Sequence, residues 1–195
     1  VLVMNDASRD ATNWIVKERK HTLVSHVFNL GYGSALQLGY KYAIRHGADY
    51  VFQTDSDGQT LPSEFSKFWR NRKKCGLLIG YRKKREDGLS RLFVTRVLRL
   101  VLWSVFGVWV KDANSPYRLM RCSQLREVLR KVPKNFFLAN VLITVIYTKK
   151  EMGVCYYPIT FLPRQGGENS INIKKIFRIG CQALRQFMAL RKRIN

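Results

Sequence analysis

Acidic residues are scarce in this chain of 195 residues. Only 13 Asp and Glu stand against 35 Lys and Arg, which gives a formal net charge of +22 at pH 7. Such an excess indicates a polyanionic partner, either nucleic acid, an anionic membrane face or a phosphorylated substrate. A hydrophobic fraction of 46% excludes a disordered chain and is sufficient for one domain with a core of its own.

Cysteine and histidine are also few, and their spacing excludes several kinds of site. The four cysteines contain no CxxC pair: Cys75, Cys122, Cys155 and Cys181. We expect all four to be reduced thiols of a cytoplasmic protein. The three histidines fall at polar positions without an acidic neighbour, and we expect them to be structural: His21, His26 and His46. No Ser/His/Asp or Cys/His arrangement indicates nucleophilic catalysis.

Two further patterns are missing. The chain has no GxxxxGK[ST] sequence, which argues against a P-loop nucleotidase. No charge-free run reaches the roughly 18 to 20 residues that a membrane-spanning helix needs. The longest candidate, residues 100–110, indicates a buried or interfacial helix.

Strands and helices alternate in the first half of the chain. Apolar runs predict strands at residues 1–4, 24–28, 49–54 and 76–80. Helical patterns follow up to residue 20 and at residues 31–46 and 62–74. This alternation predicts an α/β fold with a mostly parallel sheet and helices on both of its faces.

The second half has a different character. We expect helices at residues 89–110 and 136–150, strands at 117–121 and 154–162, and a glycine-rich loop at 164–170. Residues 171–194 form a basic amphipathic pattern, whose apolar stripe includes Leu184, Phe187 and Met188. We therefore expect a catalytic domain over residues 1–170 and an appended amphipathic helix over 171–195.

Acidic turns follow two of the predicted strands. Asn5 and Asp6 end the first strand, and Asp55 and Asp57 end the third. The carboxyl ends of parallel strands share one edge of a sheet, where ligands bind. An extended backbone would place Asp55 and Asp57 on one side, and Gln59 adds a neutral oxygen, a donor set that suits Mg²⁺. The alternative is an ordinary polar turn, because Asp57 precedes a glycine.

Residues 29–35 and three arginines suggest contacts to an anion. Asn29 and Gly31 precede a predicted helix, whose amides can approach an anion, although a simple helix cap at Asn29 is an alternative. Arg82 and Arg91 follow the fourth strand, and Arg164 precedes two glycines. Guanidinium groups from separate loops can clamp a phosphate, and the alternative is a solvated basic surface.

Asp112 is an isolated acid in the basic second half. Two roles remain open at this point: a general base, or an ion-pair partner of Lys111 or Arg118.

With these residues placed, the chain resembles a family 2 glycosyltransferase, and more closely its dolichol-phosphate mannose synthase-like, polyprenyl-phosphate branch. Six motifs carry the resemblance in the family's order: VLVMNDASRDAT, NLGYGSALQLGYKYA, DSDGQTLPSEF, GYRKKREDGLSR, DANSPYRLM and PRQGGENS. Together they span residues 1–170. The resemblance implies a glycosyltransferase A-type, Rossmann-like fold.

The resemblance also implies roles for individual residues. Contacts to the nucleotide or donor fall to Asn5, Asp6, Asn29, Gly31 and Asp55. Ligation of Mg²⁺ or Mn²⁺ falls to Asp55, Asp57 and Gln59. Phosphate binding falls to Arg82, Arg91, Arg164 and Ser170. Asp112 and Arg164 are the candidate catalytic residues, with Asp112 near the acceptor.

The activity implied is hexosyl transfer from a UDP- or GDP-sugar to a polyprenyl phosphate, by a peripheral protein at the cytoplasmic membrane face. The apolar helix from residue 92 to 110 either covers the core or lies on an anionic membrane surface, where we also expect the C-terminal helix. An acceptor hydroxyl is the alternative substrate. Because the match begins at the family's second strand and Asn5 replaces its first aspartate, an inactive relative is another alternative. No helix-turn-helix, zinc or RNP-type motif supports nucleic-acid binding, the remaining alternative.

Overall fold

The computed structural model describes residues 1–82, 88–163 and 173–194, with the backbone alone at 88–93 and 173–177. Its central element is a four-stranded sheet with the order β3–β5–β4–β6. The strands are β3 (Tyr50–Gln53), β4 (Leu77–Arg82), β5 (Arg118–Arg121) and β6 (Val154–Ile159). Strand β5 is antiparallel to both neighbours, whereas β4 and β6 are parallel. Three of the four strands therefore run in one direction, which agrees with the prediction of a mostly parallel sheet.

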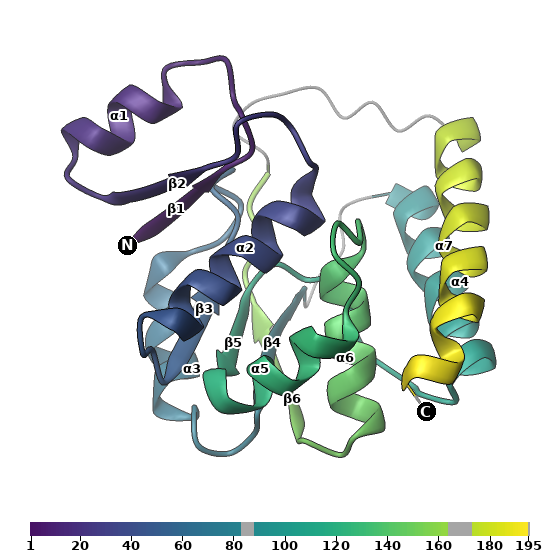
Figure 1. Cartoon of the computed structure of the whole chain (residues 1–195). Coiled ribbons are helices and arrows are strands. Elements are labelled where there is room, and N and C mark those ends of the chain that lie inside the picture. Colours follow the sequence, from purple (N-terminus) through teal and green to yellow (C-terminus); the bar gives the residue numbers. More distant parts are fainter. Residues whose placement is uncertain (83–87, 164–172, 195) are drawn as a thin grey trace.

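The first two strands form a separate sheet. β1 (Leu2–Asn5) and β2 (Thr22–Ser25) pair in parallel and are joined through α1 (Thr12–Glu18). Strand β1 packs on α2 (Tyr32–Arg45), where Gly39 admits the Met4 side chain. This small sheet and α1 lie beside the amino-terminal end of α2, at the upper left of Figure 1.

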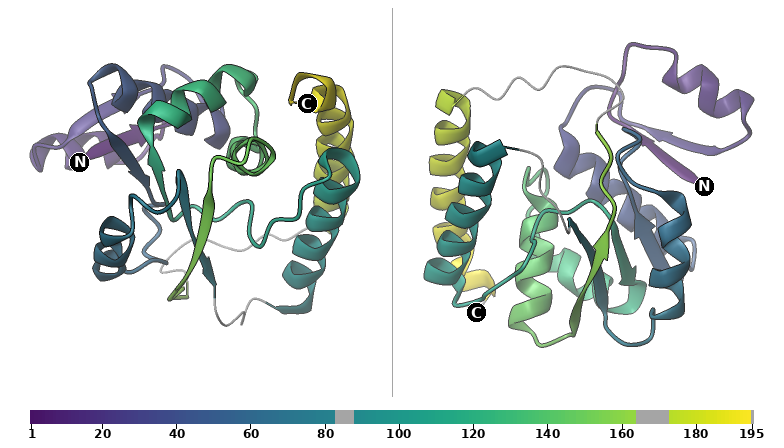
Figure 2. Two further views of the ribbon diagram at one scale, coloured as in Figure 1. Left: turned by 90° about the horizontal axis from the view of Figure 1, so that it is seen from below. Right: turned by 180° about the vertical axis from the view of Figure 1, so that it is seen from behind.

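Helices cover both faces of the four-stranded sheet, as predicted (Figure 2). On one face lie α2, α5 (Cys122–Lys131) and α6 (Ala139–Lys149), which share the main apolar cluster with Leu77, Ile79 and Met120. On the other face a 3₁₀ turn (Pro62–Glu64) leads into α3 (Phe65–Arg70), whose Phe68 is buried against Leu78 and Tyr117.

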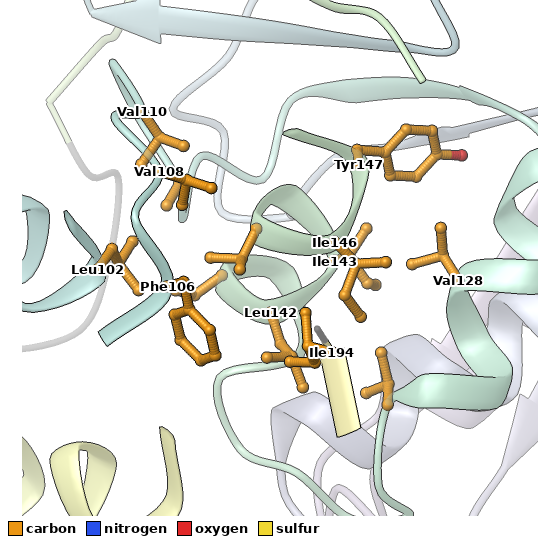
Figure 3. Packing of buried hydrophobic residues seen from close by; sticks show 14 of the residues in the cluster. Leu102, Phe106, Val108, Val110, Val128, Leu142, Ile143, Ile146, Tyr147 and Ile194 are labelled. Carbon is orange, nitrogen blue, oxygen red and sulfur yellow. The ribbon is translucent and has the colours of Figure 1, made fainter. Parts of the chain in front are cut away.

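A third layer lies outside α6. Helices α4 (Gly88–Phe106) and α7 (Ile173–Ile194) run side by side (Figures 1 and 2), and the rings of Phe106 and Phe187 meet edge to face at 5.6 Å. Figure 3 shows the packing between these helices and α6. Since α6 is enclosed by the sheet and the helix pair, every residue from 139 to 147 is buried. That enclosure explains why α6 is mostly apolar around its circumference, with Asn140 and Thr144 as its buried polar residues.

Several predictions about the second half are corrected. The helix expected over residues 89–110 ends at Phe106, because Gly107 adopts a left-handed φ of 70°. Helix α5 received no prediction. In α7, Ala183 and Phe187 face the core, whereas Leu184 and Met188 are exposed and lie beside the buried stripe.

The prediction of four reduced thiols is wrong for one pair. Cys75 and Cys155 form a disulfide, with their Cα atoms 5.9 Å apart. The parallel pairing of β4 with β6, in which Leu78 lies opposite Cys155, brings these distant residues together. Cys122 is a buried free thiol and Cys181 an exposed one.

Candidate active site

The loop from Asn29 to Tyr32 connects the two acidic turns predicted from the sequence. The Asp6 carboxylate accepts hydrogen bonds from the main-chain amides of Leu30 (2.9 Å) and Gly31 (2.7 Å). At the other end of the loop, the Tyr32 hydroxyl donates to Asp55 Oδ1 at 2.8 Å. The turns after β1 and β3 therefore lie on either side of the amino-terminal end of α2.

Asp6 also contacts His26, which corrects the expectation that no histidine has an acidic partner. The His26 Nδ1 and Asp6 Oδ1 atoms are 2.7 Å apart. Partial burial of the Asp6 carboxyl raises its pKa, but the hydrogen bonds from His26 and from the amides of Leu30 and Gly31 lower it further, so the net pKa lies below the ordinary value. Residues 20 positions apart meet here because β1 and β2 are paired.

Both asparagines of the predicted donor site are bonded to the backbone of these turns. Asn5 is 4% exposed, donates to Asn13 Oδ1 at 2.7 Å and accepts from the Ser8 amide at 3.1 Å. Asn29 donates to the Asp6 carbonyl oxygen and accepts from the Gly31 amide, both at 3.2 Å. The N-cap residue of α2 is Gly31 and no side chain caps the helix, so the simple cap considered as an alternative for Asn29 is wrong; its bond to the Gly31 amide closes a local turn before the helix. Their contacts to a nucleotide stay a prediction.

The turn after β3 is bent, so the expectation of an extended backbone at Asp55 and Asp57 is wrong. Gly58 has a φ of 72°, and Asp57 Oδ1 accepts from the Gln59 amide at 3.2 Å. This local geometry is the polar turn considered as an alternative. The Gln59 side chain donates to the Leu162 carbonyl oxygen at 3.3 Å, and the Leu162 amide donates back to the Gln59 carbonyl oxygen at 2.8 Å. The turn is thereby joined to the segment that follows β6.

The donor set of this turn fits a hard divalent cation that shares its ligands with a substrate. Asp55 and Asp57 provide carboxylate oxygens, and Gln59 provides an amide oxygen. Within the described part of the chain, no cluster of three or more His, Cys, Asp or Glu side chains could enclose a metal alone. Mg²⁺ typically binds one or two protein carboxylates and takes its other ligands from phosphates and water.

Arg82 is the one predicted phosphate-binding arginine whose side chain the structure describes. It lies at the end of β4, with its guanidinium carbon 3.5 Å from the ring centre of Phe161. Phe161 is next to Leu162, so Arg82 lies near the segment bonded to Gln59. The side chain of Arg91 and all of Arg164 and Ser170 lie outside the described residues.

Asp112 stabilises the loop before β5. Its Oδ1 atom accepts from the amides of Asn114 and Ser115, both at 3.1 Å. Lys111 lies with its Nζ atom 3.5 Å from the ring centre of Tyr81, which places this loop against the end of β4. Neither geometry decides between a general base and an ion-pair partner, so the catalytic role of Asp112 stays a prediction.

The sequence analysis did not identify Tyr32 as a site residue. Its ring is 47% exposed, yet its hydroxyl donates to Asp55 and accepts from Gln53 Nε2 at 3.0 Å. The signal available was an aromatic residue between two glycines, at the start of a helix that follows an acidic turn. Gly33, the second of these glycines, is required by the main chain of Phe136, whose oxygen would lie 2.0 Å from an added Cβ.

No protein-family profile matches the chain. Among curated proteins, it is 24% identical over 185 residues to an undecaprenyl-phosphate mannosyltransferase of Micrococcus luteus, covering 88% of this chain and 75% of that protein. It is 25% identical over 187 residues to a polyprenol monophosphomannose synthase of Mycolicibacterium smegmatis, covering 88% and 70%. A dodecaprenyl-phosphate galacturonate synthase of Rhizobium johnstonii is 25% identical over 191 residues, covering 92% of this chain but about half (54%) of that protein.

Solved structures show the same fold. Glucosyl-3-phosphoglycerate synthase of Mycobacterium tuberculosis, crystallised with Mn²⁺, UDP-glucose and phosphoglyceric acid, superposes with a TM-score of 0.66 at 16% identity. The match covers 98% of this chain and 68% of that one. The same enzyme with phosphoglyceric acid alone gives a TM-score of 0.64 at 17% identity, over 97% and 67%. The predicted glycosyltransferase A-type fold is confirmed.

Proposed function

The chain is a glycosyltransferase related to the polyprenyl-phosphate enzymes of the dolichol-phosphate mannose synthase type, and we propose that it transfers a hexose from a nucleotide diphosphate to a polyprenyl phosphate. The observation that carries this proposal is the loop from Asn29 to Tyr32, which holds Asp6 at one end and Asp55 at the other. This arrangement brings carboxylate oxygens and main-chain amides together at the carboxyl ends of strands, where α/β folds bind nucleotides.

On this proposal, the donor lies along the two acidic turns. Contacts to its base or ribose come from Asn5 and Asp6, and Asn29 and Gly31 make further contacts to the donor. Asp55, Asp57 and Gln59 hold Mg²⁺ or Mn²⁺ against its diphosphate. A bound divalent cation supplies stabilisation of the negative charge that develops on the leaving diphosphate. Guanidinium and hydroxyl groups hold the donor diphosphate or the acceptor phosphate: Arg82, Arg91, Arg164 and Ser170.

A phosphate acceptor fits what surrounds Asp112. A phosphate monoester has a second pKa of about 6 and is already largely ionised at neutral pH, so its oxygen attacks without a strong general base. Asp112 accepts two main-chain hydrogen bonds and so acts in holding the loop at the acceptor side. A hydroxyl acceptor would instead require a base there, which makes Asp112 the residue that separates the two acceptor classes.

We further propose that residues 1–170 form the catalytic domain and that α4 and α7 rest on an anionic membrane face. Both helices expose apolar side chains: Val97, Leu100, Trp103, Leu184 and Met188. Exposed cations accompany them on α7: Arg178, Arg185, Arg191, Lys192 and Arg193. In the described residues, no helix is both long and apolar enough to cross a bilayer. Such a composition is typical of helices that lie in the plane of a membrane surface.

The test is a transfer assay with undecaprenyl phosphate in detergent micelles, using UDP- and GDP-hexoses with Mg²⁺, Mn²⁺ or a chelator. We expect product with one of the two nucleotides and none with the chelator. Asp57→Asn removes one cation ligand at constant size and should lower the rate on the order of a hundredfold, because a bound metal contributes several kcal/mol.

Glu127→Gln is the matched control, since Glu127 is an exposed carboxylate on α5 far along the chain from both acidic turns. It should leave the rate unchanged. A transfer rate that neither the chelator nor Asp57→Asn lowers would contradict the cation site. A large loss of rate in Asp112→Asn, together with faster transfer to a glycan hydroxyl than to the phosphate, would contradict the phosphate acceptor and support a hydroxyl acceptor. No transfer to either acceptor by the folded chain would support an inactive relative.

A further inference from the structure

Within the described part of the chain, Arg118 is a buried cation whose hydrogen-bond partners include no carboxylate. It is 0% exposed on β5. Its guanidinium donates to the main-chain oxygens of Ser115 (2.9 Å), Ala113 (3.2 Å) and Asn140 (3.1 Å), and to the Thr144 hydroxyl at 3.4 Å. All of these acceptors are uncharged, and a buried charge is costly unless other groups compensate it. The Asp112 carboxylate, in the loop that Arg118 holds, interacts favourably with this buried charge.

A series of hydrogen-bonded side chains, buried as far as Gln53, leads from this region through the half-exposed Tyr32 to Asp55. Tyr40, which is 2% exposed, contacts Asn140 Oδ1 at 3.1 Å and donates to Gln53 Oε1. Gln53 Nε2 donates to the Tyr32 hydroxyl at 3.0 Å, and Tyr32 donates to Asp55 Oδ1 at 2.8 Å. Gln53 is also the cross-strand partner of Arg118, so both side chains lie on the same face of the sheet.

The number of protons on each group fixes the direction of the hydrogen bonds along this series of side chains. A tyrosine hydroxyl has one proton, so Tyr40 can donate to only one of its two neighbours. If it donates to Gln53, it must accept from the Asn140 amide nitrogen, which requires the Asn140 amide to be turned over. That orientation also gives a partner to Asn140 Nδ2, which is otherwise buried and unpaired. Every donor from Asn140 onward then points toward Asp55.

The last bond of the series has the same direction. An ionised carboxylate can only accept hydrogen bonds, so the Tyr32 hydroxyl is the donor to Asp55.

We propose that Tyr32 is a positioning residue for Asp55, and that the buried chain through Gln53, Tyr40 and Asn140 connects this position to Arg118 and to the loop that Arg118 holds. The inference rests on the proposed function, because it assigns Asp55 to the cation of the donor site. Oriented dipoles would link the buried positive charge at one end to the carboxylate at the other. The Asp112 loop and the Asp55 turn would then be held in one fixed relation.

The first test compares Mn²⁺ binding by the wild-type chain and by Tyr32→Phe, measured by electron paramagnetic resonance in the presence of UDP or GDP. The substitution removes only the hydroxyl. We expect about tenfold weaker Mn²⁺ binding, within the range found when partners of metal ligands are lost. Tyr42→Phe is the matched control, because Tyr42 lies on the same helix but stacks on His46. It should bind Mn²⁺ as the wild type does.

The second test asks whether the hydrogen-bonded side chains from Asn140 to Tyr32 act as a unit. Tyr40→Phe alone should weaken Mn²⁺ binding. The double variant, which also carries Tyr32→Phe, should bind Mn²⁺ within about twofold of Tyr32→Phe alone, because Tyr32→Phe already removes the hydrogen bond that joins the series to Asp55. If Tyr40→Phe does not fold, Gln53→Met interrupts the chain at nearly constant size. If the losses of Mn²⁺ affinity add in the double variant, Tyr40 acts independently of Tyr32, and the proposed series of hydrogen bonds would be rejected.

The outcomes separate this inference from the function on which it rests. Wild-type Mn²⁺ binding that Asp57→Asn abolishes, but that Tyr32→Phe leaves intact, would overturn the positioning role and keep the cation site. If the wild-type chain binds no Mn²⁺ with either nucleotide, both the cation site and the role of Tyr32 fall. Tenfold weaker binding in Tyr32→Phe, with Tyr42→Phe unchanged, would support the inference.

Discussion

Asp6 shows how one carboxylate can determine the geometry of a site at the scale of a single residue. Its two oxygens accept from the amides of Leu30 and Gly31 and meet His26 at 2.7 Å. These contacts come from the residue that follows β2 and from a loop, 20 to 25 positions away in the chain. Charge-assisted hydrogen bonds of this kind are stronger than neutral ones, so Asp6 fixes the loop that leads to Tyr32.

Asp6→Asn should therefore destabilise the fold by about 1–2 kcal/mol at about pH 7, since it removes the charge on these hydrogen bonds. The pKa of Asp6 is lowered from 3.8 in the folded state. Its stabilisation is thus fully present above that ordinary value and is lost as the pH falls through the lower, folded-state pKa. Urea unfolding of both proteins at several pH values measures the difference, which should shrink as the pH falls below 3.8. A difference that is constant with pH would contradict this assignment.

At the scale of elements, the close approach of α2 to the loop before α6 places the site. Gly33 lies in the first turn of α2, and an added Cβ there would be 2.0 Å from the Phe136 main-chain oxygen. Main-chain atoms cannot rotate away as a side chain can. The absence of a side chain at this position is therefore what lets α2 bring Tyr32 to Asp55.

Gly33→Ala should lower the free energy of unfolding by about 1–3 kcal/mol, the usual cost of overpacking. Gly180→Ala is the matched control, because Gly180 lies within α7 and nothing is within 4 Å of its added Cβ. There the same substitution should stabilise the protein by up to about 1 kcal/mol, through helix propensity. Urea denaturation of both variants tests the contrast, and equal effects would contradict it.

At the scale of the whole molecule, charge and exposed apolar surface are combined on the outer helix pair. The net charge of +22 includes the exposed arginines and lysines of α7. Trp103 on α4 is 58% exposed, and Val97 and Leu100 of the same helix are also exposed. An exposed tryptophan beside cations is typical of a protein that rests on an anionic bilayer.

We expect the chain to sediment with vesicles that contain phosphatidylglycerol and much less with phosphatidylcholine alone. High salt should weaken binding, because the screening length falls from about 10 Å at 0.1 M to about 3 Å at 1 M. Trp103→Ser should lower affinity on the order of tenfold through lost apolar contact. Trp14→Ser is the control, since Trp14 is 64% exposed on α1, away from the helix pair. Equal losses in both variants would contradict a membrane face at α4 and α7.

The local pattern of the sequence predicted most of the elements and the ends at which the site residues lie. Alternating apolar runs located the strands, and polar turns after residues 5 and 53 located the acidic groups. Helix α5 escaped prediction because its buried positions, among them Leu125 and Val128, are separated by charged residues. The bend at Asp57 contradicts the expectation of an extended strand end and agrees with the alternative of a polar turn, which Gly58 indicated.

What the sequence by itself determined is the α/β succession, the positive charge and the six motifs that resemble a glycosyltransferase, because each depends on residues a few positions apart. Only the tertiary structure decided which distant groups meet: Asp6 with His26, Cys75 with Cys155, and Tyr32 with Asp55. The pairing register of strands and the crossing of helices set these contacts, over separations of 20 to 80 residues. The burial of Arg118 likewise follows from β5 lying between β3 and β4, an order that no local pattern contains.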